Sequence, residues 1–283
     1  MPPKLYSKAH CLPSSMPSGH LIANTATPEL YVDAEGISLS RHGELSILIV
    51  HIETATFSHT YLLHVHVLGH PTFYMKSSCG KHSLKTIFED NRIPKVLFDC
   101  RMDSDAMFGQ FGVLLGGAID LQLMCLATQD GGPRGLPGLE ACLLNHLNIS
   151  GEERAWVTEA KARGQKLWRP RCGGSMAVFN DNPLHPDIIN YCVVDAAYLP
   201  QLFEIYNAAL GNEVSLMAVD TLWGNEDAYE LANDRDFSPV YSWSRRIIRH
   251  TAERVAYSLL PGFTGGTGRN PWWIPDYYDD DDY

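Results

Sequence analysis

The alternation of apolar and polar positions begins with three strand-like runs, over residues 30–39, 44–53 and 60–68. Each is an apolar block or alternates with period two, as strands of a sheet do. Only a few polar residues separate the runs, and the first gap contains Arg41-His42-Gly43. This spacing predicts an antiparallel meander.

Downstream, the apolar period changes to that of helices alternating with short strands. Ser83 is the expected N-cap of a first helix, and Pro200 is expected to kink or divide the longest one. Strands are expected over 95–100 and 118–121, and helices over 83–90, 101–112, 121–128, 139–147 and 183–210. The pattern predicts an α/β fold, a mixed sheet with antiparallel first strands and helices on its faces.

Composition divides the chain into four parts. Residues 1–28 are rich in Ser and Pro and are expected to be disordered, and 29–211 contain the predicted sheet and helices. Residues 212–262 are expected to form a helical extension that offers a surface to a protein partner. The end, 263–283, reads as a flexible acidic tail.

The overall composition restricts the class of protein. The chain has 283 residues, a net charge of -11 and 45% hydrophobic residues, enough for one large core. Seven cysteines without a Cys-x-x-Cys pair favour an intracellular setting, nuclear or cytoplasmic, with a mitochondrial location left open. No apolar run approaches the roughly 20 residues of a membrane helix. The acidic balance argues against a protein that coats nucleic acid, but permits an enzyme whose acids hold metal ions.

Candidate chemistry starts on the first strand, where Asp33 and Glu35 are two residues apart. Side chains alternate along a strand, so both carboxylates point to one face. Like charges this close favour a cation between them, and oxygen ligands suit Mg²⁺ or Mn²⁺. The simpler interpretation is a solvated strand face with two chance acids.

Two later segments add acids at comparable places. Asp103 lies in the first turn of the helix that follows the strand at 95–100. Tyr191 and Asp195 are four residues apart on the long helix and therefore share a face. Three separated segments thus each offer an acid to one site.

This set of motifs resembles the DEDD superfamily of 3′–5′ exonucleases, in the DEDDy subgroup with the third motif Tyr-x-x-x-Asp and the branch of RNase D, Werner and Egalitarian-like proteins. The matching motifs are Asp33-Ala34-Glu35-Gly36, Val96-Leu97-Phe98-Asp99-Cys100-Arg101-Met102-Asp103-Ser104 and Tyr191-Cys192-Val193-Val194-Asp195. The resemblance covers about residues 30–210. It implies a ribonuclease H-like fold and metal-dependent hydrolysis of RNA or single-stranded DNA.

The resemblance also implies roles for five side chains and two Mg²⁺ or Mn²⁺ ions about 3.5–4 Å apart. Asp33 would bridge both ions, Glu35 and Asp195 would bind the ion that activates water, and Asp103 would hold the second through its water shell. Tyr191 would orient the attacking water, because a phenol with a pKa near 10 is a poor base at neutral pH.

Substrate contacts are expected at two places. By resemblance, the substrate strand packs against the first motif, at the backbone of Gly36 and the side chain of Ile37. A local basic run contains Lys166, Trp168 and Arg169, which could contact phosphates and stack on a base. A solvated helix and loop explains the same run equally well.

Two alternatives stay open. The first is a nucleic-acid-binding or adaptor protein that keeps the exonuclease fold without turnover, as members of the Egalitarian-like branch do. The second is a structural zinc site built on His64, His66, Cys79 and His82, although their spacing matches no common zinc pattern.

The second motif contains three competing acids. The family pattern selects Asp103, in the first helical turn after the strand. Asp99 and Asp105 would then be a strand-end residue and a surface acid.

Overall fold

The computed structural model describes residues 30–78, 80–129, 136–211, 214 and 239–263, the last range with side chains from 246 onward. The expected disordered N-terminus, most of the segment between 212 and 238, and the acidic tail from 264 lie outside these ranges. The boundaries of the four predicted parts therefore stay predictions.

One five-stranded mixed sheet forms the centre of the described chain. Its strand order is β3-β2-β1-β4-β5, so β1 is the middle strand. β1, β2 and β3 pair antiparallel, whereas β4 pairs parallel with both β1 and β5. The strands are β1 (Leu30–Ile37), β2 (Glu44–Glu53), β3 (Ser58–His64), β4 (Lys95–Leu97) and β5 (Ala118–Asp120). The predicted antiparallel meander and mixed sheet are confirmed.

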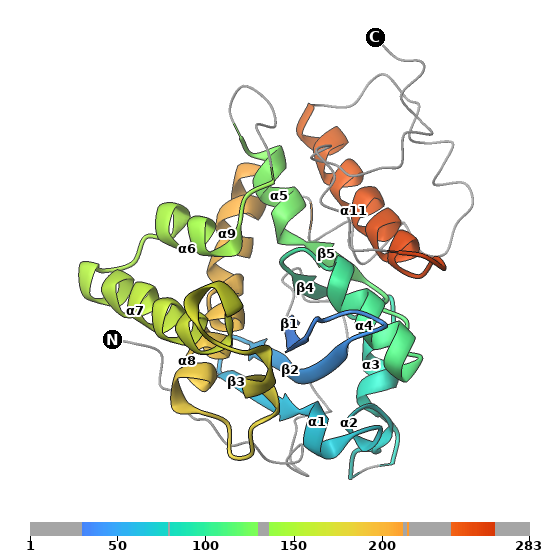
Figure 1. Ribbon diagram of the computed structural model, residues 1–283. Coiled ribbons are helices and arrows are strands. Elements are labelled where there is room, and N and C mark those ends of the chain that lie inside the picture. Colours follow the sequence, from blue (N-terminus) through green and yellow to red (C-terminus); the bar gives the residue numbers. More distant parts are fainter. Residues whose placement is uncertain (1–29, 79, 130–135, 212–213, 215–238, 264–283) are drawn as a thin grey trace.

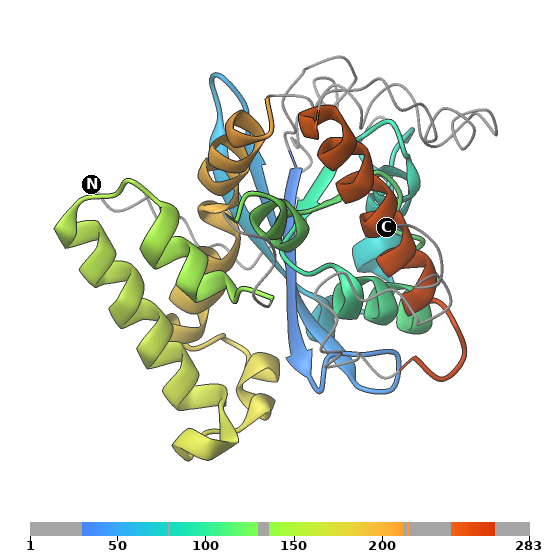
Figure 2. The same cartoon turned by 90° about the horizontal axis from the view of Figure 1, so that it is seen from above.

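Helices cover both faces of this sheet (Figures 1 and 2). Seen from above, α6, α7, α8 and α9 lie to one side, and α3, α4 and α11 lie to the other (Figure 2). The described helices are α1 (Val65–Leu68), α2 (Pro71–Tyr74), α3 (Leu84–Glu89), α4 (Arg101–Phe111), α5 (Leu121–Ala127), α6 (Leu139–His146), α7 (Gly151–Trp168), α8 (Pro186–Ala197), α9 (Leu199–Ala209) and α11 (Pro239–Ser258), with 3-10 turns η1 (Pro170–Cys172) and η2 (Met176–Asn180). None of the described helices is long and apolar enough to span a bilayer.

Strand alternation on β1 divides the core into two layers. Tyr31 belongs to a buried cluster with side chains of α5, α6 and α9. Val32 and Ala34 point the other way, into a cluster with side chains of α3 and α4. The strand that holds the candidate acids is therefore fixed by apolar packing on both faces.

Local sequence signals place several helix ends. Ser83 caps α3 through a hydrogen bond from the Thr86 N–H, and the Thr86 hydroxyl accepts one from the Ser83 N–H, as a capping box does. The stretch expected as one helix over 183–210 is two, which meet at Tyr198. Pro200 stands in the first turn of α9, where a missing N–H breaks no helical bond.

The third strand ends earlier than the alternation predicted. β3 stops at His64, and the next four residues form helix α1. His66 lies on that helix, and its Nδ1 is 2.5 Å from Glu44 Oε1. His64 and His66 therefore do not share a strand face. Cys79, a third member of the suggested zinc site, lies outside the described residues.

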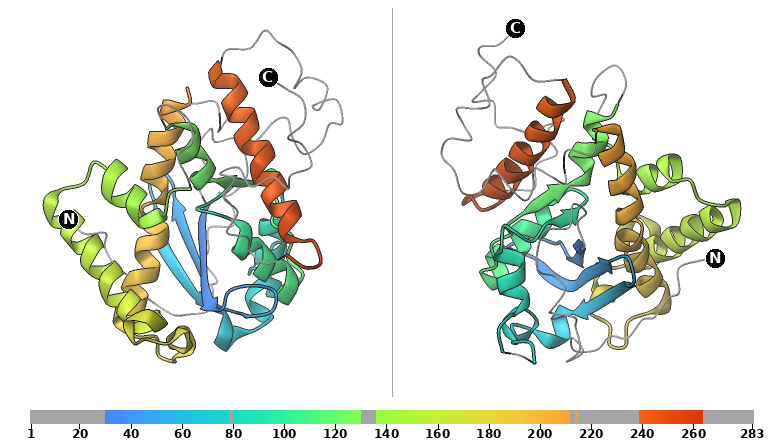
Figure 3. Two further views of the ribbon diagram at one scale, coloured as in Figure 1. Left: turned by 45° about the horizontal axis from the view of Figure 1, so that its top comes forward. Right: turned by 180° about the vertical axis from the view of Figure 1, so that it is seen from behind.

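Helix α11 packs against the far edge of the sheet and holds the turn into α4 (Figure 3). Arg254 Nη1 on α11 donates to Asp120 Oδ2 at 2.6 Å, and both side chains are buried. The Asp120 carboxylate also accepts the N–H groups of Asp99 and Cys100, at 3.0 and 3.2 Å. This network fixes the backbone between β4 and α4, because a buried carboxylate with this many donors has little freedom.

The expectation that Asp105 is a surface acid is wrong. Asp105 is buried on α4, and its carboxylate accepts hydrogen bonds from the Arg41 backbone N–H at 2.6 Å and from Arg41 Nε at 2.5 Å. It therefore fastens the loop between β1 and β2 to α4. Asp99 does follow the strand end, in a left-handed conformation with φ 63°.

Candidate active site

The site is built on β1, at the centre of the sheet. Asp33 and Glu35 alternate with the buried residues Ala34 and Gly36, so the two carboxylates share one face. A β-bulge follows Glu35, and a Cβ at Gly36 would lie 1.8 Å from the Glu44 carbonyl oxygen. Only glycine permits this approach of β2, which sets the local direction of the strand after Glu35.

Helix α8 brings the third acid to the same place. Asp195 is buried on the face that α8 turns to the sheet. Carboxylate oxygens of Asp33, Glu35 and Asp195 all lie within 4.8 Å of one another. The fold thus brings the first and third motifs together, as predicted, although they lie about 160 residues apart in the sequence.

Asp103 approaches from α4, on the opposite side of β1. It is buried, and its carboxylate accepts a hydrogen bond from the Ala34 backbone N–H. Its charge raises the pKa of both Asp33 and Glu35, which places it beside them. The acid chosen from the second motif therefore lies with the other three, whereas Asp105 and Asp99 are engaged by arginines.

A buried lysine that the sequence interpretation did not single out completes the cluster. Lys161 on α7 places its Nζ 2.5 Å from Asp195 Oδ1 and 3.6 Å from the centroid of the Tyr191 ring. A sequence signal existed: Val157, Lys161 and Gly164 are spaced as one helix face, and the other two are apolar or small. A lysine in such a stripe is expected to find a buried partner.

Tyr191 is held by contacts from α7. Its hydroxyl hydrogen-bonds to the Glu35 carboxylate. Gly164 lies against it so closely that a Cβ there would be 2.4 Å from Tyr191 Cβ. The Trp168 ring packs edge-on to the Tyr191 ring, at 5.9 Å between centroids. Ring, hydroxyl and helix contact together fix where the Tyr191 oxygen lies.

The electrostatics of the cluster are those of crowded carboxylates. Burial, followed by the neighbouring acids, raises the pKa of Asp33 well above its ordinary value and that of Glu35 to about 8. Burial also raises the pKa of Asp103 to about 8. Burial raises the pKa of Asp195 as well, although the Lys161 ammonium lowers it in part. In the absence of a further cation the cluster therefore retains protons near neutral pH.

Burial and the same acids also raise the pKa of Tyr191, so its hydroxyl stays protonated at neutral pH.

The donor set fits divalent metal ions. Asp33 Oδ2, Asp103 Oδ1 and Asp195 Oδ2 are buried and have no hydrogen-bond partner among the described residues. Leaving a buried polar group without a hydrogen-bond partner costs about 1–3 kcal/mol, and an ionised carboxylate costs more. Oxygen ligands are those that Mg²⁺ and Mn²⁺ prefer. Three unpaired oxygens from three segments are what a site for such ions requires.

The expected substrate contacts differ in exposure. Gly36 is buried and Ile37 is half-buried at the end of β1, whereas Lys166 is exposed on α7. Trp168 is half-buried between Tyr191 and Phe179, and the Arg169 guanidinium lies 5.0 Å from its ring centroid. Trp168 therefore packs against the Tyr191 ring. The contacts of all five with a substrate stay a prediction.

Comparison with protein-family models identifies the family of this chain. The profile described as 3′–5′ exonuclease matches residues 20–210, a range that contains the three motifs. The chain belongs to the 3′–5′ exonuclease family.

Three relatives share its sequence in part. The piRNA biogenesis protein EXD1 of Mus musculus is 30% identical over 178 residues, which cover 60% of this chain and 27% of that protein. EXD1 of Xenopus laevis is 27% identical, over 66% of this chain and 39% of that protein. EXD1 of Homo sapiens is 30% identical, over 60% and 30%. The match thus spans well under half the length of these relatives.

Solved structures share the fold. Trypanosoma brucei RNase D in complex with GMP superposes with a TM-score of 0.53 at 18% identity, over 84% of this chain and 60% of that one. The same enzyme in complex with RNA U12 gives 0.52 at 16% identity, over 87% and 71%. The exonuclease domain therefore has the predicted ribonuclease H-like fold.

Proposed function

We propose that this chain is a metal-dependent 3′–5′ exonuclease that hydrolyses phosphodiester bonds of RNA or single-stranded DNA. The observation that supports this most is the convergence of Asp33, Glu35 and Asp195, whose oxygens lie within 4.8 Å of one another. Asp103 lies beside them, and three carboxylate oxygens of the cluster have no partner among the described residues. The family of the chain and its RNase D-like fold agree with the proposal.

The metal ligands in this proposal are Asp33, Glu35, Asp103 and Asp195. Bound Mg²⁺ or Mn²⁺ would supply an activated water and stabilise the leaving oxygen of the phosphodiester. The protein contributes a fixed set of oxygens from β1, α4 and α8, held at short range by the core on both faces of the sheet. Because these acids repel a phosphate, the chain would accept one only with cations present.

In this proposal Tyr191 positions the attacking water and does not act as a base. Its pKa is raised by burial and by the acids around it, so the phenol is a hydrogen-bond donor throughout the neutral range. It already donates to Glu35, one of the acids assigned to the ion that activates water. In this proposal Tyr191 orders that water against Glu35.

Lys161 is the further residue that the proposal uses. Its ammonium pairs with Asp195 Oδ1 and leaves Oδ2 of the same carboxylate unpaired. It also lies over the Tyr191 ring, so one side chain fixes both residues of the third motif. We assign it the role of orienting Asp195 and Tyr191, and of partly neutralising the acids when metal is absent.

Digestion of a labelled oligonucleotide tests the proposal. RNA and DNA of one sequence, labelled at the 5′ end, are incubated with Mn²⁺, Mg²⁺ or EDTA. A ladder of labelled products that shorten stepwise, absent in EDTA and with a substrate blocked at its 3′ end, supports a 3′–5′ exonuclease. The same gel shows which sugar is preferred. Release of the labelled 5′ nucleotide first contradicts the direction.

A second candidate is a nucleic-acid-binding or adaptor protein without turnover. The Lys161–Asp195 ion pair favours it, because an internal cation already neutralises one metal ligand. The similarity to relatives named piRNA biogenesis proteins is compatible with a function on RNA other than hydrolysis. Fluorescence anisotropy of labelled RNA distinguishes the two: in the adaptor, binding is retained and insensitive to Mn²⁺, with no cleavage.

A further inference from the structure

A second group of potential metal ligands lies outside the exonuclease site. Cys125 on α5, and Cys142 and His146 on α6, each place one ligand atom within 4.8 Å of the other two. Cys142 and His146 are four residues apart on one helix, so they share a face. Both cysteines are buried, whereas His146 is exposed. None of the three is used by the proposed exonuclease.

The distances match those of a tetrahedral thiolate site. The two sulfurs are 3.6 Å apart, and Cys125 Sγ is 3.9 Å from His146 Nδ1. With Zn–S bonds of about 2.3 Å and a Zn–N bond of about 2.0 Å, tetrahedral angles place sulfur atoms about 3.8 Å apart and sulfur about 3.5 Å from nitrogen. A disulfide would need about 2.05 Å between the sulfurs. The observed spacing therefore suits ligands around an ion better than a bonded pair.

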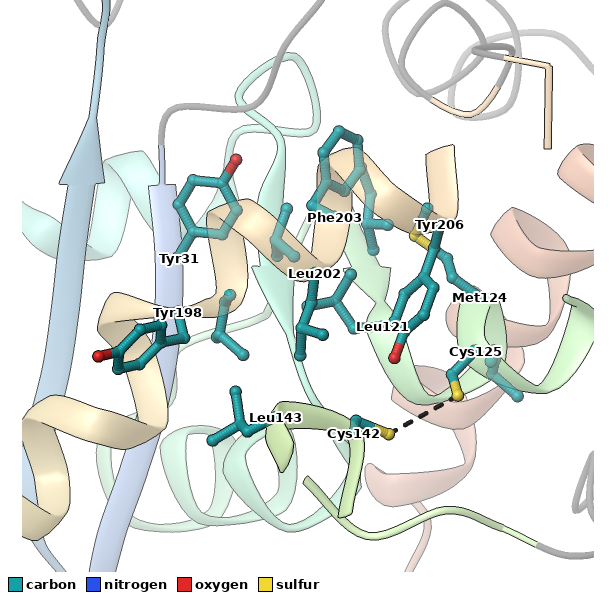
Figure 4. Packing of buried hydrophobic residues seen from close by; sticks show 14 of the residues in the cluster. Tyr31, Leu121, Met124, Cys125, Cys142, Leu143, Tyr198, Leu202, Phe203 and Tyr206 are labelled. Carbon is teal, nitrogen blue, oxygen red and sulfur yellow. Dashed lines mark hydrogen bonds between the residues drawn. The ribbon is translucent and has the colours of Figure 1, made fainter. Parts of the chain in front are cut away.

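A tyrosine supports the same group from α9. Figure 4 shows the Tyr206 hydroxyl pointing toward the Cys125 and Cys142 sulfurs. The hydroxyl is also 2.7 Å from His146 Nδ1, a contact that it gives up when this nitrogen binds an ion, so that its proton then goes to the Cys125 sulfur. Three helices thus direct polar atoms at one point, at the border of an apolar cluster that contains Cys125, Cys142 and Tyr206. Such a hydrogen-bonding neighbour is what orients the ligands of protein metal sites.

We propose that Cys125, Cys142 and His146 bind a soft divalent cation of the zinc class, with the Tyr206 hydroxyl as a hydrogen-bonding neighbour. Thiolate and imidazole ligands select such an ion over Mg²⁺ or Mn²⁺, so this site and the carboxylate site do not compete for one metal. Each thiol loses its proton when it binds. The three protein ligands leave a fourth position, which water would fill. The bound ion ties α5 to α6.

Cobalt(II) titration of the full-length chain, reduced and freed of metal, tests this proposal. We expect a sulfur-to-cobalt charge-transfer absorption that saturates at one equivalent, with the visible bands of tetrahedral cobalt, and its loss when Zn²⁺ is added. Carboxylate ligands give no such band, so cobalt at the exonuclease site is silent in this assay. The expected band is strongly reduced in Cys125→Ser and in Cys142→Ser, and is unchanged in Cys172→Ser, a control at an exposed cysteine.

A measurement on the unmodified chain guards against variants that fail to fold. Zn²⁺ should slow alkylation of Cys125 and Cys142, mapped by mass spectrometry, and leave Cys172 as reactive as before. A charge-transfer band that survives Cys125→Ser overturns the proposal. So does a reduced protein that shows neither the band nor protection at stoichiometric metal.

Discussion

Replacing Gly164 with alanine is a small change that should disturb the site without altering a carboxylate. Gly164 lies on α7 against Tyr191, and an added Cβ would be 2.4 Å from Tyr191 Cβ and 2.6 Å from its Cγ and Cδ2. Carbon atoms in contact are ordinarily about 3.5–4.0 Å apart. The Tyr191 ring, or α7 as a whole, must therefore move by about 1 Å.

The magnitude follows from two opposing effects on stability and one on catalysis. Overpacking a buried contact costs about 1–3 kcal/mol, and replacing glycine within a helix regains about 1 kcal/mol. We expect a net loss of about 0–2 kcal/mol in the free energy of unfolding. A positioning group displaced by about 1 Å lowers the rate by about 10²-fold. This rate loss corresponds to about 2.7 kcal/mol of transition-state stabilisation, somewhat more than the expected loss of stability.

Initial rates of oligonucleotide shortening, measured beside urea unfolding, check this prediction. Gly151→Ala is the matched control, because Gly151 lies on the same helix and a Cβ there meets nothing within 4 Å. It should keep both rate and stability. In a Tyr191→Phe background, Gly164→Ala should lower the rate little further, since the displaced hydroxyl is already gone.

Two results would contradict this role of Gly164. One is a wild-type rate in Gly164→Ala, which would mean that the position of Tyr191 does not matter. The other is an equal loss of rate with and without the Tyr191 hydroxyl, which would place the effect on the helix alone.

Three further predictions concern the charges of the site. Lys161→Met should lower the free energy of unfolding by about 3 kcal/mol or more in EDTA, because it removes the partner of buried Asp195, and by less with Mn²⁺ present; equal losses in urea unfolding under both conditions would contradict this. In EDTA, stability should fall as pH rises from about 4 to about 8. Folding raises the pKa of Glu35 and Asp103 to about 8, so the folded chain keeps protons that the unfolded chain releases near pH 4. Thermal unfolding at pH 5 and pH 8 measures this fall, and Mn²⁺ should reduce it. Lys166→Ala combined with Arg169→Ala should weaken RNA binding more at low salt than at high salt, as lost phosphate contacts do; an affinity ratio that is constant across a salt titration would return this run to a solvated surface.

The sequence was most informative where one local pattern determines one element. The period-two pattern of β1 put Asp33 and Glu35 on one face, and the helical period of α8 put Tyr191 with Asp195. Alternation misled at the end of β3, because the alternation of His64-Val65-His66-Val67 continues past the last strand residue, His64, into helix α1. Four residues of alternation are too few to exclude one helical turn.

Contacts between distant segments were beyond the sequence. Asp105 looked like a surface acid, but Arg41, 64 residues earlier, accounts for its burial. Lys161 was one basic residue among several in its run, and only the packing of α7 on α8 shows that it alone of these faces Asp195. Such partners are set by tertiary packing, which local periodicity does not encode.

The most direct test of hydrolysis at the carboxylate cluster is a single-turnover digestion in Mn²⁺ of the wild-type chain and of Asp195→Asn, with RNA binding measured on the same samples. Asparagine keeps the size of the side chain and can still accept a hydrogen bond from Lys161, so the fold should persist. We expect stepwise shortening by the wild type, none in EDTA, and none by Asp195→Asn although RNA is still bound. Equal cleavage by the variant would contradict the assignment of this site. Binding without cleavage by the wild type would instead favour the adaptor.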